Sequence, residues 1–66
     1  MSSLGEQLPK EQARARELLT QYRELGINGV FGAFTIEQAL QNADRAVMSG
    51  DLVSMMQAYE ELKGLE

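Results

Sequence analysis

Apolar residues recur every three or four positions in three stretches of this 66-residue chain, and each stretch stops at a glycine. That period is typical of amphipathic helices, and no stretch shows the alternation of a half-buried strand. Gly26, Gly50 and Gly64 mark the three ends, and Gly26 suits the left-handed residue that follows a helix. The sequence therefore predicts an all-α fold with helices over about residues 9–25, 29–49 and 51–63.

The first and third helices have clear predicted starts. Pro9 suits the first turn of a helix and disfavours the α region for Leu8, so residues 1–8 are expected to form a flexible segment. Asp51 directly follows Gly50 and is a good N-cap. So short a connection predicts an antiparallel hairpin of the second and third helices. We expect one domain over residues 1–66, either a three-helix bundle or an open three-helix array.

The start of the middle helix has two alternatives. In the long version Asn28 caps the helix, and Gly32 lies inside it at a cost of about 1 kcal/mol relative to alanine. In the short version Thr35 is the cap, and Gln38 completes a capping box. The apolar stripe extends backwards as far as Gly29, which slightly favours the long version.

The length of the chain limits its core. A domain of this size buries only about 60 % of its unfolded surface, and its core rarely contributes more than about 3–5 kcal/mol. Disulfides or zinc stabilise many small folds, but the sequence has no cysteine and no histidine. A homo-oligomer is therefore expected. Without imidazole or thiolate groups the common catalytic sets are missing, so we expect a non-enzymatic protein without metal or cofactor.

The balance of charge disfavours two classes of partner. Ten acidic and six basic residues give a net charge of −4, which argues against non-specific nucleic-acid binding. No apolar run reaches the roughly 18 residues needed to cross a bilayer. The first four residues lack the charged and apolar regions of a signal peptide. The expected location is the cytoplasm, with no membrane partner.

Three glycines lie in residues 26–34, at the start of the middle helix. Backbone amides at such a position can bind an anion, but the spacing matches no phosphate-binding motif, and close helix packing explains the small residues better. Packing is the favoured interpretation. In an oligomer, arginines and tyrosines from several subunits would complete a site for an anionic nucleotide. The candidate residues are Gly29, Gly32, Ala33, Arg14, Arg16, Arg23, Arg45, Tyr22 and Tyr59.

Large apolar residues exceed what one small core can take. At most one of Phe31 and Phe34 can easily face the core, so an aromatic side chain left uncovered is expected to lie at an interface. The alternative is that both fold back over the end of the first helix. Met55 and Met56 fit the core stripe of the third helix, and Met48 is the better candidate for exposure. The expected interface residues are Phe31, Phe34, Met48, Ile27 and Val30.

Two stretches resemble known families. Residues 50–62 (GDLVSMMQAYEEL) resemble the second helix of a tetratricopeptide repeat, although Met55 replaces a usually small residue. Because the chain is too short for two 34-residue repeats, this implies one helical hairpin. Over residues 8–66 the chain is similar to small uncharacterised proteins of bacterial prophages. The segments that carry this similarity are residues 11–19 (EQARARELL), Phe31-Gly32-Ala33 and residues 43–66.

The second resemblance implies a phage accessory protein. Small acidic helical proteins of this kind often bind and block a host factor, and some self-assemble to sequester nucleotide signals of host immunity. The expected function is therefore a self-associating binding protein that inhibits a host factor. The alternatives are an oligomeric sponge for an anionic nucleotide and a structural oligomerisation module.

Overall fold

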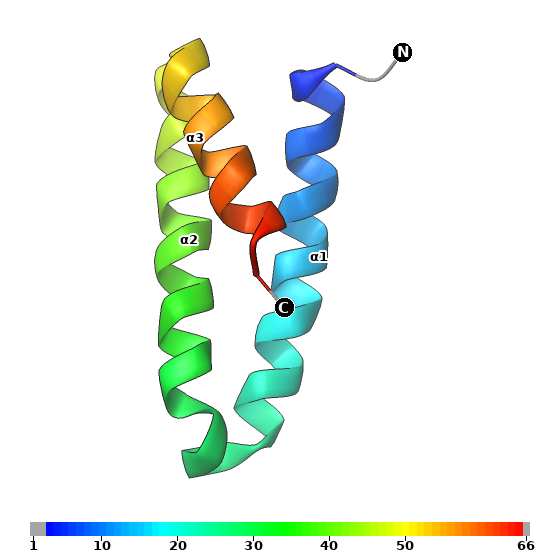
Figure 1. The fold of residues 1–66 in the computed structure, drawn as a ribbon, viewed down its shortest axis with the longest axis vertical. Helices are drawn as coiled ribbons and strands as arrows, with labels where there is room; N and C mark the ends of the chain where they lie inside the picture. The colour runs from blue at the N-terminus through cyan, green and yellow to red at the C-terminus, as the bar shows by residue number, and fades with distance from the viewer. Residues whose placement is uncertain (1–2, 66) are drawn as a thin grey trace.

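Three packed helices make up this protein. The computed structural model describes residues 3–65, with helices α1 (Leu4–Glu24), α2 (Val30–Ser49) and α3 (Leu52–Lys63). A 3-10 turn, Gly26–Gly29, joins α1 to α2, and residues 3–65 contain no strand. α1 and α2 run antiparallel over the length of the molecule, and α3 packs against both in the upper half (Figure 1). The predicted all-α three-helix array is confirmed.

The start of α1 differs from the prediction. The helix begins at Leu4 and contains Pro9, so the expected start at Pro9 is wrong. Residues 4–8, expected to be flexible, are helical, and residues 1–2 of that segment lie outside the described residues. Leu8 is fully buried and Leu4 packs against the core. Full burial of a leucine contributes about 1.5–3 kcal/mol, so Leu8, together with the partly buried Leu4, offsets the roughly 3 kcal/mol cost of a proline inside a helix.

The start of α2 agrees with the long version, with its cap moved by one residue. Gly29 is the N-cap, and Asn28 lies in the preceding 3-10 turn. Thr35 is well inside the helix, where its hydroxyl donates a hydrogen bond to the carbonyl of Phe31 at 3.1 Å. The capping box at Thr35 is therefore wrong, because the helix continues backwards to the contact of α2 with α1.

The glycines that follow α1 and α2 and the cap of α3 form as predicted. Gly26 and Gly50 both have positive φ, at 64° and 70°. Asp51 caps α3, since its carboxylate accepts hydrogen bonds from the backbone N–H of Ser54 at 3.2 Å and from the Ser54 hydroxyl at 2.6 Å. These hydrogen bonds lower the pKa of Asp51. At the other end of α3, Gly64 is the C-cap but keeps a right-handed conformation.

The core between the helices is small and rich in alanine. Its larger members are Leu8, Leu19, Ile36, Leu40 and Leu62. Six alanines fill the remaining positions and let the helices approach closely: Ala15, Ala33, Ala39, Ala43, Ala46 and Ala58.

The buried face of α3 is rotated relative to the predicted stripe. Ala58 and Leu62 are buried, and Met55 is half-buried against the core. Met56, expected in the core, is 53 % exposed. The inward positions of α3 follow residues 55, 58 and 62, which places Met56 outside this face.

Candidate functional site

Five large apolar side chains are exposed at the end of the molecule where α1 meets α2. This corner patch consists of Leu25, Ile27, Val30, Phe31 and Phe34. α3 does not extend over this end, since it stops at mid-height (Figure 1). Phe31 is 82 % exposed and Phe34 is 58 % exposed, so the alternative that both fold back over α1 is wrong.

The packing of α2 on α1 explains why these side chains point outward. Gly29 and Gly32 face Tyr22. A Cβ at Gly29 would lie 2.0 Å from the Tyr22 carbonyl oxygen, and one at Gly32 would lie 2.2 Å from the tyrosine ring. With this face against α1, Val30, Phe31 and Phe34 lie on the opposite side of the helix. Gly29 and Gly32 therefore allow α2 to pack closely on α1, because a side chain at either position would clash with Tyr22.

The structure groups four of the five expected interface residues. Ile27, Val30, Phe31 and Phe34 belong to the corner patch. Met48 is 88 % exposed, as predicted, but it lies near the other end of α2, about 21 Å from Phe34 along the helix axis. Leu25, the residue that follows the last residue of α1, is the fifth member of the patch and is 57 % exposed.

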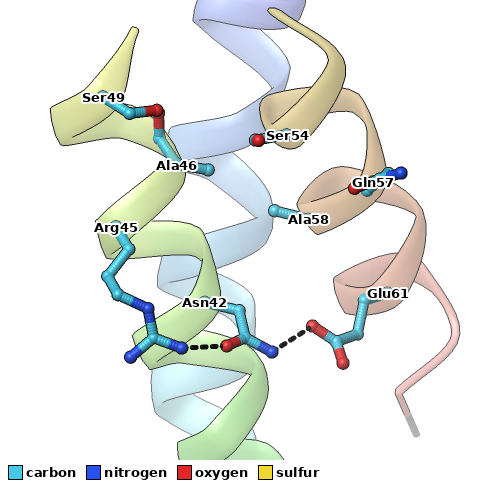
Figure 2. A pocket seen from close by; sticks show the side chains of 8 residues that line it. All are labelled: Asn42, Arg45, Ala46, Ser49, Ser54, Gln57, Ala58 and Glu61. Atoms are coloured by element: carbon cyan, nitrogen blue, oxygen red, sulfur yellow. Dashed lines mark hydrogen bonds between the residues drawn. The ribbon is translucent and has the colours of Figure 1, made fainter. Parts of the chain in front are cut away.

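The four arginines lie on different parts of the surface. Arg14 donates hydrogen bonds to the carbonyls of Leu62 at 2.6 Å and Leu65 at 3.3 Å, which holds the end of α3 on α1. Arg45 lies between α2 and α3 and donates to Asn42 (Figure 2). These two arginines are therefore separated from each other and from the glycine corner.

The other two arginines line one groove. It has a volume of about 420 Å³ between α1 and α2, and both guanidinium groups face carboxylates there. Arg16 lies 3.7 Å from Asp44, and Arg23 lies 2.5 Å from Glu37. All four side chains are substantially exposed, so solvent screens both pairs.

The two candidate tyrosines do not share a site. Tyr22 packs over Gly32 at the corner. Tyr59 lies in α3 with the Nζ of Lys63 5.3 Å from its ring centroid. One chain therefore does not bring the predicted nucleotide-binding residues together. A site built from all of them requires several copies.

Sequence reasoning missed a polar groove between α2 and α3. Its volume is about 500 Å³, and Ala46 and Ala58 lie between polar side chains from both helices (Figure 2). Arg45 donates to Asn42, whose side-chain amide donates to Glu61 at 3.2 Å, so a chain of hydrogen bonds joins the two helices. The spacing of Asn42 and Arg45, one turn apart, was the available signal.

A third groove lies between the start of α1 and α3, and we call it the α1/α3 groove. Its volume is about 410 Å³. Sequence reasoning missed it because residues 1–8 were expected to lie outside the fold. Its lining residues are Ser3, Leu4, Gln7, Leu52, Met56, Tyr59 and Glu60.

Other site types are not found in the described chain. Within residues 3–65, no group of His, Cys, Asp and Glu side chains is arranged to hold a metal ion. No helix in this range has the length and apolar character needed to cross a bilayer. Comparisons with protein-family models, curated proteins and solved structures found no significant match. The two resemblances therefore rest on the quoted residues alone.

Proposed function

We propose that this chain is a non-enzymatic binding protein that associates with further copies of itself through the corner patch. The observation that carries this proposal is an imbalance of apolar side chains. Residues 3–65 expose ten large hydrophobic residues and bury five apolar residues larger than alanine. Burying apolar surface contributes about 25 cal/mol per Å², so association would add stability that the small core lacks.

The overall shape supports the same proposal. The solvent-accessible surface is 4580 Å². A compact monomer of this mass is expected to expose about 4200 Å². The radius of gyration is 12.1 Å, and the principal extents are 37 × 22 × 16 Å. A compact chain of this length would have a radius of about 10.8 Å. The chain is thus elongated, and an end-to-end contact would cover part of the extra surface.

The absence of charge makes the corner patch suited to a symmetric contact. Residues 25–36 contain no charged side chain. A twofold contact places the same patch of two copies together, so an uncharged patch meets its copy without repulsion. Exposed phenylalanines are also the residue type enriched at the centres of interfaces.

Sedimentation equilibrium with a Phe31→Ala variant tests this proposal. The wild-type chain is expected to sediment at a multiple of 7.3 kDa. Truncating a central aromatic anchor should weaken association by about 10-fold or more. The matched control is Met48→Ala, because Met48 is equally exposed at the opposite end. A wild-type mass of one chain at all concentrations, or equal dissociation of both variants, would contradict the proposal.

The resemblance to prophage proteins supports a host protein as the target of the assembled chain, with inhibition as the biological role. The corner patch and the remaining apolar residues provide surface for such a partner. Capture from a bacterial lysate on immobilised wild-type chain, compared with the Phe31→Ala chain, tests this extension.

A second candidate function is nucleotide binding by the assembled protein. The observation that favours it is that Arg16 and Arg23 line the same groove. They are two helical turns apart, about 10 Å along the axis, which suits a ligand with two phosphate groups. Exposed ion pairs contribute about 0–1 kcal/mol, so phosphates would compete effectively with Asp44 and Glu37.

Thermal shift with cyclic and linear mono- and dinucleotides tests the second candidate. A ligand at 100 times its Kd should raise Tm by about 10 °C or more in a chain of this size. The shift is expected to disappear in Arg16→Gln and Arg23→Gln and to persist in Arg45→Gln, which lies between α2 and α3. A flat response to the whole panel excludes the candidate.

A further inference from the structure

The α1/α3 groove is an apolar surface that the corner patch does not include. Leu52 and Met56 lie one turn apart on α3 and line the groove, yet they are 61 % and 53 % exposed. Leu4 lines it from the first turn of α1, and Tyr59 lines it from the middle of α3. Room of about 410 Å³ remains between these side chains. The groove can therefore accept apolar side chains from outside.

The course of α3 explains why the groove is open. α3 runs obliquely, near α2 at its start and near α1 at its end (Figure 1). Its end is held on α1 by Arg14, which binds the Leu62 and Leu65 carbonyls. At its start, the N-cap Asp51 follows directly on the turn from α2. The upper parts of α1 and α3 are thus kept apart by constraints at both ends of α3.

The charges at this end of the molecule are all of one sign. Residues 3–9 and 46–62 contain Glu6, Asp51, Glu60 and Glu61 and no lysine or arginine. Glu60 lines the groove itself. Lys63 lies further along α3, with its Nζ over the Tyr59 ring. Glu60 is thus the one charged residue among the described residues that line the groove, Glu6 and Asp51 lie near its upper end, and Glu61 is turned towards α2, where Asn42 donates to it.

We propose that the α1/α3 groove binds an amphipathic helix of a partner protein that carries apolar anchors and basic residues. The anchors would lie against Leu52 and Met56, because methionine adapts its shape to different apolar side chains. Lysine or arginine of the partner would lie towards Glu60 on the groove wall and towards Glu6 and Asp51 near the upper end. This charge pattern disfavours two other occupants. The acidic residues around this groove would repel the same residues of a second copy, and they would also repel an anionic membrane.

Fluorescence anisotropy with a labelled model peptide tests this inference. The probe is a 14-residue helical peptide of leucine and lysine with leucines at helical spacing, and the matched probe has glutamate in place of lysine. The lysine peptide is expected to bind at least about 10-fold more tightly than the glutamate peptide. Met56→Ala and Leu52→Ala should each raise Kd about 10-fold, while Met48→Ala should leave it unchanged.

A second pair of variants separates the site from general attraction of a basic peptide to an acidic protein. Glu60→Gln removes a charge from the groove, and Glu17→Gln removes the same charge from exposed α1 surface. At physiological ionic strength, where charges more than about 8 Å apart are largely screened, Glu60→Gln is expected to raise Kd about threefold and Glu17→Gln should have no effect. Circular dichroism of each variant confirms that the helices are intact before its Kd is interpreted.

Three outcomes would overturn the inference. They are equal binding of both peptides, equal weakening by Met56→Ala and Met48→Ala, and equal weakening by Glu60→Gln and Glu17→Gln. A loss of peptide binding in Phe31→Ala would place the peptide at the corner patch instead. The inference does not depend on self-association, since a dissociated Phe31→Ala chain should still bind the lysine peptide.

Discussion

Gly29 sets how closely α2 approaches α1, and thereby which side chains face the solvent at the corner. The position that a Cβ would take lies 2.0 Å from the Tyr22 carbonyl oxygen and 3.0 Å from the Leu25 Cβ. The nearest obstacle is backbone, which cannot move without shifting α1. A glycine at this residue therefore fixes both the close contact and the outward direction of Phe31 and Phe34.

Replacing this glycine should destabilise the chain. Gly29→Ala forces α2 away from α1, and overpacking of this kind costs about 1–3 kcal/mol in the free energy of unfolding. The matched control is Gly5→Ala, where the nearest atom is a serine side-chain oxygen at 3.7 Å inside exposed α1. There the better helix propensity of alanine should raise stability by up to about 1 kcal/mol. Urea denaturation followed by circular dichroism measures both. Equal stability of the two variants would contradict this explanation of the corner.

At the scale of the elements, the sequence predicted the boundaries that local residues set better than the start of α1, which depends on packing. Gly26, Gly50 and Asp51 act locally, through their own backbone conformation or side chain, and these three were predicted. The start of α1 depends instead on Leu4 and Leu8 packing on a core built by the other helices. Leu4 and Leu8 are four residues apart and continue the buried stripe of α1, but Pro9 is a strong local signal for a helix start, and the sequence does not show that packing outweighs it.

The candidate surfaces follow the same division. The corner patch was predictable in part, because the inward stripe of α2 leaves room for at most one of Phe31 and Phe34. That both lie outside the core was settled only by the contact of Gly29 and Gly32 with Tyr22. The α1/α3 groove was not predictable, since it requires both the early start of α1 and the rotation that exposes Met56. The positions of the arginines relative to one another likewise depend on which helices lie side by side. The spacing of residues along one helix does not predict that arrangement.

At the scale of the whole molecule, charge and apolar surface are distributed along the long axis. The end formed by residues 25–36 is apolar and uncharged. The opposite end combines exposed apolar residues with the acidic side chains Glu6 and Asp51. The uncharged end suits a contact with the same end of a second copy, and the acidic end suits a basic partner. The two contacts would therefore use different surfaces.

If the uncharged ends pair, the thermal stability of the chain should depend on its concentration. Only folded chains associate. A tenfold increase in chain concentration therefore raises the free energy of unfolding of a dimer by about 1.4 kcal/mol, or about 0.7 kcal/mol per chain. For a domain of this size that raises Tm by about 3–6 °C. Scanning calorimetry of the wild-type chain over a hundredfold range of concentration measures the effect.

The Phe31→Ala chain provides the comparison for this last measurement. Its Tm should be lower and should vary less with concentration, because association is weaker. Phe31 is mostly exposed in one chain, so its truncation costs little within the fold itself. The difference between the two proteins should then grow with concentration, which a loss of packing inside one chain cannot produce. A wild-type Tm that stays constant over the range would mean that the small alanine-rich core stabilises the folded chain without a partner.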